Sequence, residues 1–211
     1  MPARRDEQFE NNVFINCPFD SEYQHLLRPL LFIVVTLGFH PKIALERSDS
    51  GELRITKICG LIKQSRYSVH DLSRLQSREA NELYRMNMPF ELGIEYGCRQ
   101  FASGPLKRKQ CLILEKERFE AMKALSDLSG VDVKSHGNDP AGLVREVRNW
   151  FVETVGLRGI DSPQTLWYRF NRFITDFYIK RRGEGFSEND LSTMPVSEFI
   201  DFIRAWTGDQ E

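Results

Sequence analysis

Short runs of apolar residues alternate with amphipathic segments along the chain as far as Gly159. The runs suit strands, and they lie at residues 13–17, 42–45, 67–72, 110–114 and 131–133. Between them, apolar positions recur every three or four residues, which predicts helices that begin near residues 21, 53, 89, 117 and 140. Strands that alternate with helices predict a mainly parallel sheet of about five strands, covered by helices on both faces.

The pattern changes after Gly159, where no further strand is predicted. Two groups of apolar residues recur at helical spacing: Leu166, Trp167, Phe170, Phe173, Ile174, Phe177 and Tyr178, then Phe199, Ile200, Ile203 and Trp206. Aromatic stripes of this kind are typical of a packed core. We therefore expect a flexible N-terminus at residues 1–11, an α/β domain at residues 12–158 and a helical appendage at residues 160–211. The appendage is expected either to pack on the sheet domain or to mediate association, with a second copy of the chain or with a partner protein.

The composition is that of an ordinary globular protein without a strong net charge. Of 211 residues, 41% are hydrophobic and 28% are charged, and the formal net charge is −1. A nearly neutral chain has no overall attraction for nucleic acid or for a membrane surface, so neither is expected as a partner. Two basic clusters, Arg181–Arg182 and residues 107–109, are interpreted as solvated loops.

The cysteines and the N-terminal residues indicate a reducing compartment. Cys17, Cys59, Cys98 and Cys111 lie among apolar neighbours and form no C-x-x-C pair, which is typical of buried reduced thiols. The first residues are polar and do not resemble a secretory leader. The longest apolar run, residues 30–39, is too short to span a bilayer. A cytoplasmic location is therefore expected.

The sequence NMPFELGIEYG at residues 87–97 predicts a helix that carries two glutamates. Pro89 suits the first helical position, because its missing N–H costs nothing there. Glu91 then falls at the third position, where a carboxylate often caps backbone N–H groups. Glu95 lies one turn further along, as a support or surface residue. An apolar stripe is expected to face the core: Phe90, Ile94, Cys98 and Phe101. Glu91 therefore has two interpretations, a helix cap or a functional carboxylate.

Polar residues follow three of the predicted strands and also open the Glu91 helix. Ligands of parallel α/β sheets bind outside the carboxyl ends of the strands, so we expect these residues to converge there. The expected acting carboxylates are Glu91 and Asp71. The expected ligand-binding residues are Asn16, Pro18, Phe19, Asp20, Arg47, Ser48, Asp49, Arg54, Ser73 and Asn87.

Structural roles stay open for some of these residues. Asp20 and Asp49 also suit helix caps, and Asp49 with Glu52 matches a capping box. His70, which precedes Asp71, alternates to the other face of its strand and suits the core. Asp71 itself is costly at a strand end unless it is paired or solvated.

Several familiar catalytic motifs are missing from the sequence. It contains no G-x-G-x-x-G and no G-x-x-x-x-G-K-[ST], which argues against a Rossmann dehydrogenase and a P-loop nucleotidase. It also contains no G-x-S-x-G, the motif of a nucleophilic serine elbow. His25, His40 and His136 are scattered, and no His/Cys spacing indicates a metal site. Carboxylates without a metal, thiol or serine nucleophile suit chemistry at an acetal-like carbon, where a carboxylate stabilises or traps an oxocarbenium-like centre.

Four segments in order carry a family resemblance: VFINCPF at residues 13–19, SVHDLS at 68–73, PFELGIEYG at 89–97 and CLIL at 111–114. Together they resemble the nucleoside 2-deoxyribosyltransferase-like proteins and the related TIR-like superfamily, over residues 12–115. The resemblance implies a flavodoxin-like, three-layer α/β fold and a site for a nucleoside or nucleotide. A looser likeness to small bacterial TIR-like proteins implies a role in defence or signalling.

The same resemblance implies roles for the two carboxylates. In the transferases the helix glutamate attacks the anomeric carbon, and in TIR-type enzymes the comparable glutamate engages the ribose of NAD; Glu91 matches both. The strand-end aspartate, which matches Asp71, holds the base or the sugar. The chain departs from the transferases at Met88–Pro89, where they usually have Gly-Thr or Gly-Ser.

The resulting prediction is a nucleotide N-glycosidic-bond hydrolase or transferase that acts on NAD and needs no cofactor. The charged segment at residues 47–54 favours a phosphate-bearing ligand, with Arg47 and Arg54 as planar forks for phosphate. The alternative is a non-catalytic nucleotide-binding sensor or assembly module, in which the same pocket binds a nucleotide and the C-terminal helices contact a partner.

Overall fold

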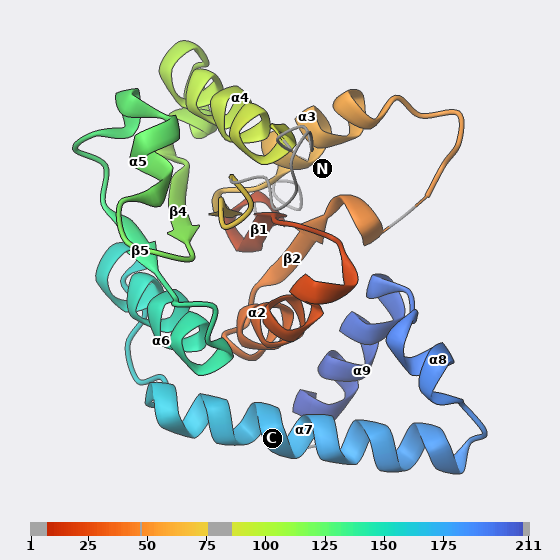
Figure 1. Ribbon diagram of the computed structural model, residues 1–211. Helices are drawn as coiled ribbons and strands as arrows, with labels where there is room; N and C mark the ends of the chain where they lie inside the picture. The colour runs from red at the N-terminus through yellow and green to blue at the C-terminus, as the bar shows by residue number, and fades with distance from the viewer. Residues whose placement is uncertain (1–7, 47, 76–85, 209–211) are drawn as a thin grey trace, which may run out of the picture.

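The computed structural model describes residues 8–46, 48–75 and 86–208, and a parallel sheet lies at its centre (Figure 1). The strands are β1 (Asn12–Asn16), β2 (His40–Ile43), β3 (Tyr67–Asp71), β4 (Gln110–Glu115) and β5 (Val133–Ser135). Their order across the sheet is β2-β1-β3-β4-β5, and every neighbouring pair is parallel. This order is that of flavodoxin-like folds. The predicted α/β flavodoxin-like fold is therefore confirmed.

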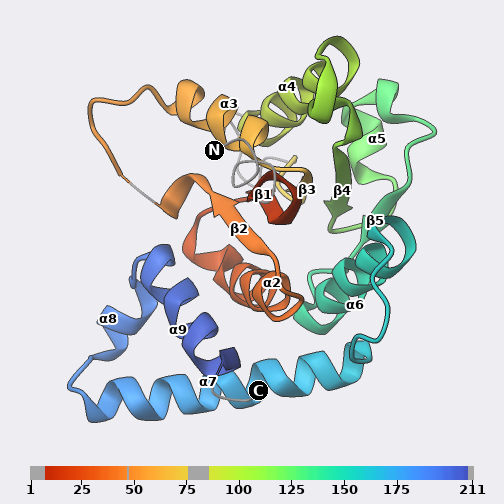
Figure 2. The same ribbon diagram turned by 180° about the vertical axis from the view of Figure 1, so that it is seen from behind.

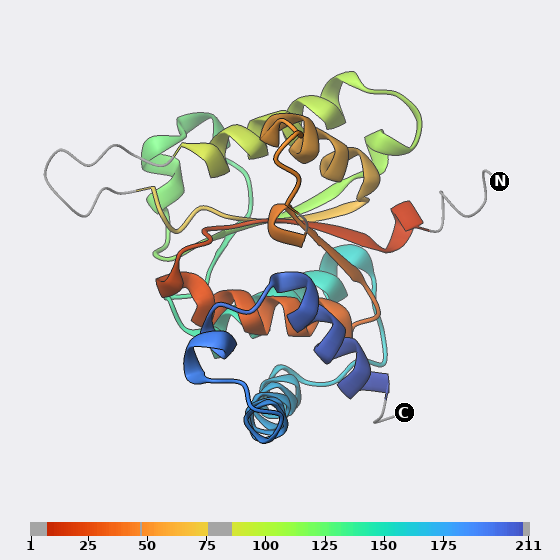
Figure 3. The ribbon, with the colours of Figure 1, turned by 90° about the vertical axis from the view of Figure 1, so that its right-hand side faces the viewer.

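Helices cover both faces of the sheet (Figure 3). On one face lie α3 (Arg54–Gln64), α4 (Asn87–Phe101) and α5 (Glu120–Ala124); on the other lie α2 (Gln24–Thr36) and α6 (Pro140–Trp150). Side chains alternate along β1, so that Val13 and Ile15 pack in the core with α2 and α6, whereas Phe14 packs with Ile58 of α3. β1 is therefore buried on both faces, which explains its continuous apolar sequence.

The C-terminal helices share a hydrophobic core with the sheet domain. They are α7 (Pro163–Gly183), α8 (Glu188–Ser192) and α9 (Val196–Gly208). The long helix α7 runs outside α2 and α6, and α9 lies beside α2 (Figure 2). The ring of Phe32 in α2 contacts the rings of Phe170, Phe173 and Trp206, with centroid distances of 5.5, 5.3 and 5.9 Å. The predicted helical segment thus packs on the sheet domain, and its part in association stays a prediction.

Several predicted boundaries are displaced. β2 covers residues 40–43 rather than 42–45, and β5 covers 133–135 rather than 131–133. The helix predicted from residue 117 is reduced to α5 and the turn η4 (Ser126–Leu128). The other short turns are η1 (Ser21–Tyr23), η2 (Ala44–Glu46) and η3 (Gly104–Arg108), all 3-10, and the π-helical turn η5 (Phe151–Val155).

The start of α3 differs from the predicted capping box. The carboxylate of Asp49 accepts a hydrogen bond from the backbone N–H of Gly51 at 2.9 Å, and so closes a turn ahead of the helix. The helix begins at Arg54, after Leu53, which gives no side-chain cap. The capping-box prediction for Asp49 is therefore wrong.

Candidate functional site

A cleft of about 250 Å³ opens at the carboxyl end of β1, and we call it the switch-point cleft. The chain leaves β1 toward β2 on one side, while the sheet continues through β3 on the other, so the strand order reverses here. Ligands of open α/β sheets bind at such a point. The cleft is lined by Asn16, Cys17, Pro18, Phe19, Asp20, Arg54, Asn87 and Met88. Six of the predicted binding residues therefore line one cavity: Asn16, Pro18, Phe19, Asp20, Arg54 and Asn87.

Glu91 does not itself line this cleft, but it contacts Arg54, which does, and it does not lie at a helix cap. Because α4 begins at Asn87, with Met86 as its N-cap, Pro89 is the third helical residue and Glu91 the fifth. The capping interpretation of Glu91 is therefore wrong. Its side chain is only 7% exposed, and its carboxylate lies 3.6 Å from the guanidinium of Arg54. Burial raises the pKa of Glu91, although the charge of Arg54 opposes this effect.

Arg54 connects Glu91 to the mouth of the cleft. Its guanidinium lies 5.7 Å from the centre of the Phe19 ring, within the range of a cation–π contact. Its side chain is 53% exposed. The planar guanidinium therefore keeps free N–H donors toward solvent, where an anionic group of a ligand is able to reach them.

The other predicted carboxylate, Asp71, does not line the cleft. It belongs to a group that we call the Asp71 cluster, in which Tyr23, Asp71 and His136 are buried and Ser73 is half-buried. Tyr23 Oη donates to Asp71 at 2.5 Å, His136 Nε2 lies 3.1 Å from it, and Ser73 N–H donates at 2.8 Å. Burial by itself raises the pKa of Asp71, but the hydrogen bonds of His136, Ser73 and Tyr23 outweigh it, and the pKa is lowered. Asp71 is therefore an ionised carboxylate that protein donors already satisfy.

Ser73 in this cluster is not an activated nucleophile. The backbone N–H of Asn138 donates to His136 Nδ1 at 3.0 Å, so the ring proton of the neutral imidazole resides on Nε2. That same nitrogen lies 2.9 Å from Ser73 Oγ. Because Nε2 carries the proton, it cannot accept the hydroxyl proton of Ser73. Ser73 lines a second, smaller cavity of about 120 Å³, together with Tyr23 and Arg74.

Asp20 and Arg74 separate the two cavities. Asp20 lines the switch-point cleft and accepts from Arg74 at 2.6 Å, and Arg74 lines the smaller cavity. Asp20 also accepts from the backbone N–H of Tyr23 at 3.1 Å, so its expected capping role is observed at η1. The ion pair therefore fixes the loop after β1 against the loop after β3.

Cys17 lines the cleft but is a poor nucleophile. Burial, with the charges of Asp71, Glu91 and Asp20, raises the pKa of its thiol well above the ordinary value. The thiolate is the reactive form of cysteine, and it is suppressed here. All four cysteines are free.

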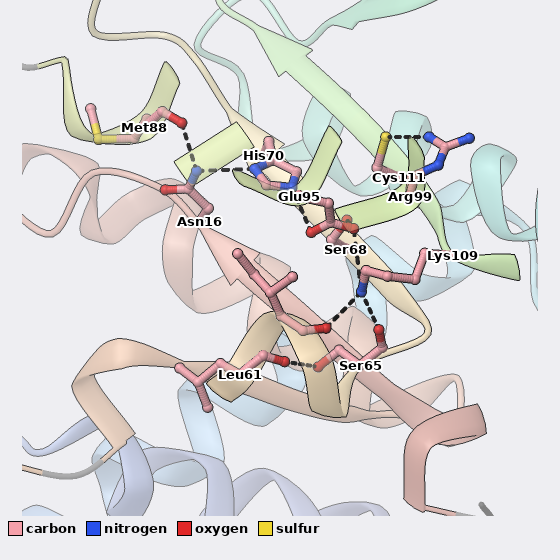
Figure 4. A network of polar contacts seen from close by, with 11 residues as sticks. Asn16, Leu61, Ser65, Ser68, His70, Met88, Glu95, Arg99, Lys109 and Cys111 are labelled. Carbon is pink, nitrogen blue, oxygen red and sulfur yellow. Dashed lines mark hydrogen bonds and ion pairs between the residues drawn. The ribbon is translucent and has the colours of Figure 1, made fainter. Parts of the chain in front are cut away.

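Beneath α4 lies a buried set of polar contacts that we call the α4 network: Asn16, Ser68, His70, Glu95 and Lys109 (Figure 4). Glu95 accepts from Ser68 Oγ at 2.7 Å, and its second oxygen lies 3.1 Å from His70 Nε2. Lys109 Nζ lies 3.4 Å from Glu95 and donates to the carbonyl oxygens of Ile62, at 2.8 Å, and Ser65. Burial raises the pKa of Glu95, but the hydrogen bonds and charges of His70, Lys109 and Ser68 outweigh it, so the pKa is lowered.

This network overturns three sequence interpretations. Glu95 was expected to be a support or surface residue, and its full burial rules out the surface alternative. Lys109, taken as part of a solvated loop, is 1% exposed. The predicted core stripe of α4 is also wrong at its ends, because Phe90 is 62% and Phe101 is 90% exposed. The helix instead turns Met88, Leu92 and Glu95 inward, and the polar contacts of Glu95 make its burial tolerable.

The remaining predicted residues lie elsewhere. Ser48 and Asp49 are exposed in the loop before α3 and do not line the cleft. Arg47 lies outside the described residues. Sequence reasoning missed Tyr23 and His136, although His136 directly follows β5 and so comes from the same edge of the sheet. The displaced prediction of β5 hid this signal.

In comparisons with known proteins, no protein-family model, curated protein or solved structure matches this chain. Within residues 8–46, 48–75 and 86–208, no three His, Cys, Asp or Glu side chains are grouped so as to hold a metal ion. In the same part of the chain, no helix has both the length and the apolar character of a membrane span. The fold is therefore assigned from its topology, and the function is argued from the cleft.

Proposed function

We propose that the chain cleaves the N-glycosidic bond of a nucleotide, as a hydrolase or a transferase, with NAD as the leading candidate substrate. The observation that carries the proposal is the position of Glu91. Its carboxylate is buried, has a raised pKa and lies 3.6 Å from Arg54, which lines the switch-point cleft. A poorly solvated carboxylate gains most when positive charge develops beside it, as it does at the anomeric carbon during N-glycosidic cleavage.

The groups around Glu91 favour a leaving group that needs no proton. When nicotinamide leaves NAD, the C–N bond breaks with its electron pair going to the positively charged ring nitrogen, and neutral nicotinamide forms. Asp71 does not suit a general acid, because its pKa is lowered and it is ionised. Cys17 holds its proton too tightly, because its pKa is raised. Water or another acceptor then bonds to the anomeric carbon and releases its proton to Glu91 or to solvent.

The size of the cleft supports a ligand that is only partly enclosed. Its volume of about 250 Å³ is below the ~300–1,000 Å³ that is typical of sites for drug-sized ligands. One nucleoside-sized half of a dinucleotide suits this space, with the phosphates near the exposed side of Arg54. In this arrangement Asp71 is a positioning residue that fixes Tyr23 and Ser73 from behind. A role in bacterial defence or signalling rests on the family resemblance alone.

Thermal unfolding with candidate ligands, followed by chromatography of the ligand, tests this proposal. NAD, ADP-ribose and adenosine are added separately, and a ligand that binds the native state raises the melting temperature. We expect NAD to be recovered as nicotinamide and an ADP-ribosyl product. Stabilisation by NAD that is recovered intact favours the sensor or assembly alternative. Neither stabilisation nor conversion by any of the ligands contradicts both.

A further inference from the structure

The side chain of Asn16 joins the α4 network to the switch-point cleft. Its amide nitrogen donates to the backbone carbonyl of Met88 at 2.9 Å and lies 3.0 Å from His70 Nδ1. Both amide protons are therefore used within the protein. No described residue donates to the amide oxygen of Asn16, and Asn16 lines the cleft. Figure 4 shows this oxygen pointing away from Met88 and His70.

The orientation of this amide is fixed by the carbonyl of Met88, and it is compatible with only one tautomer of His70. The carbonyl of Met88 only accepts, so the atom of Asn16 facing it is the nitrogen. That nitrogen also faces His70 Nδ1, which accepts only when the ring proton is on Nε2. A turned amide would leave two acceptors facing each other in a buried place, which is costly.

Glu95 and Lys109 hold His70 in the required tautomer. His70 Nε2 lies 3.1 Å from a carboxylate oxygen of Glu95, which accepts its proton. Glu95 remains a carboxylate because Lys109 lies 3.4 Å away and Ser68 donates to it at 2.7 Å. All of these groups are buried. These residues therefore contact one another in series: Lys109 contacts Glu95, Glu95 contacts His70, and His70 contacts Asn16, which lines the cleft.

We propose that this order of contacts makes Asn16 a specificity-determining residue, which presents a fixed hydrogen-bond acceptor to the ligand in the switch-point cleft. The ligand must then bring a donor to this point, either a hydroxyl of the ribose or the N–H of an amide. A ligand that lacks the donor leaves the oxygen of Asn16 desolvated and unpaired, which disfavours it. His70 is a positioning residue that acts through Asn16. The selectivity rests on the proposed function, whereas the amide orientation does not.

The selectivity is tested with NAD and three analogues. These lack the 2′-hydroxyl of the nicotinamide ribose, its 3′-hydroxyl, or the amide N–H, as in the nicotinic acid analogue. For the wild type, we expect kcat/KM for one analogue to fall about 10–100-fold below that for NAD. In Asn16→Ala, this preference should shrink to about twofold, because the discriminating acceptor is gone. Asn171→Ala, at an exposed position of α7, is the control, and it should keep the preference.

Nitrogen-15 NMR of the histidine rings tests the amide orientation without any ligand. We expect His70 to carry its proton on Nε2 and to have an unprotonated Nδ1. The opposite tautomer would overturn the assigned orientation, and a preference that survives in Asn16→Ala would overturn the selectivity. If the wild type neither binds nor cleaves NAD, the proposed function fails, and the proposed selectivity fails with it. The tautomer of His70 still decides the orientation of the Asn16 amide.

Discussion

Replacing Lys109 with methionine tests whether a buried charge pair holds α4 against the sheet. The side chains of Lys109 and Glu95 are both 0% exposed, and Lys109 Nζ also donates to two carbonyl oxygens near the end of α3. Methionine keeps most of the apolar stem but removes the charge and the donors. Glu95 is then a buried carboxylate without its cation, and the carbonyls of Ile62 and Ser65 lose their partner.

The expected loss of stability is large. Removing one partner of a buried ion pair costs about 3–5 kcal/mol, and the two unsatisfied carbonyls favour the upper end of that range. At ~2–4 °C per kcal/mol for a chain of this size, the melting temperature should fall by roughly 6–20 °C. Urea unfolding followed by circular dichroism measures the free energy directly.

Three comparisons make the Lys109 result interpretable. Lys107→Met, at an exposed position of η3, should change stability by no more than about 0.5 kcal/mol. Glu95→Gln combined with Lys109→Met should recover much of the loss, because the unpaired charge is removed. The deficit of Lys109→Met should also shrink at acidic pH, where Glu95 is protonated. A single variant within about 1 kcal/mol of the wild type at pH 7, or a double variant no more stable than the single, would refute the reasoning.

Further predictions concern charge and backbone at other positions. Because the pKa of Glu91 is raised in the folded protein, its ionisation costs stability as pH rises through that pKa. Glu91→Gln should therefore be more stable than the wild type at pH 8 and equal to it near pH 4. Urea unfolding at the two pH values measures the difference. The pKa of Asp71 is lowered, so its contribution to folding stability is present above the ordinary pKa of 3.8 and is lost as pH falls through the folded pKa. Asp71→Asn should therefore cost about 3 kcal/mol at pH 7, and progressively less in an acid titration. An added Cβ at Gly142 would lie 2.8 Å from the carbonyl oxygen of His136, so Gly142→Ala should destabilise by about 1–3 kcal/mol. Gly60→Ala in α3 meets no atom within 4 Å and should instead stabilise by about 0.5–1 kcal/mol, measured in the same thermal unfolding series.

The sheet and most of the helix order follow from the sequence, because burial on both faces leaves continuous apolar runs in β1 and β4. The predicted bounds of the edge strands were displaced because these strands lack such a run. β2 contains Pro41 and an exposed His40, and β5 has three half-buried residues, so neither carries a strong pattern. α4 begins before Pro89 at a residue without a side-chain cap, so no local signal marks its first residue.

The order of strands and helices along the chain was enough to predict the position of the cleft, but not the buried polar contacts. The loop after β1 and the start of α4 meet because parallel strands bring their carboxyl ends to one edge. The partners of Glu95 and Asp71 depend on tertiary contacts instead: His136 lies 65 residues after Asp71, and His70 lies 25 residues before Glu95. A charged residue with a distant buried partner has the same local sequence as a solvated one. Lys109 was therefore placed in a solvated loop, and a surface position was left open for Glu95.

The most direct test of the central claim is the release of nicotinamide from NAD by the purified wild type and by Glu91→Gln, quantified by chromatography. Glu117→Gln, an exposed glutamate after β4, is the matched control. We expect release by the wild type and the control, and a rate at least about 100-fold lower for Glu91→Gln, with circular dichroism confirming that it is folded. Undiminished release by Glu91→Gln, or no release by the wild type, would contradict the account.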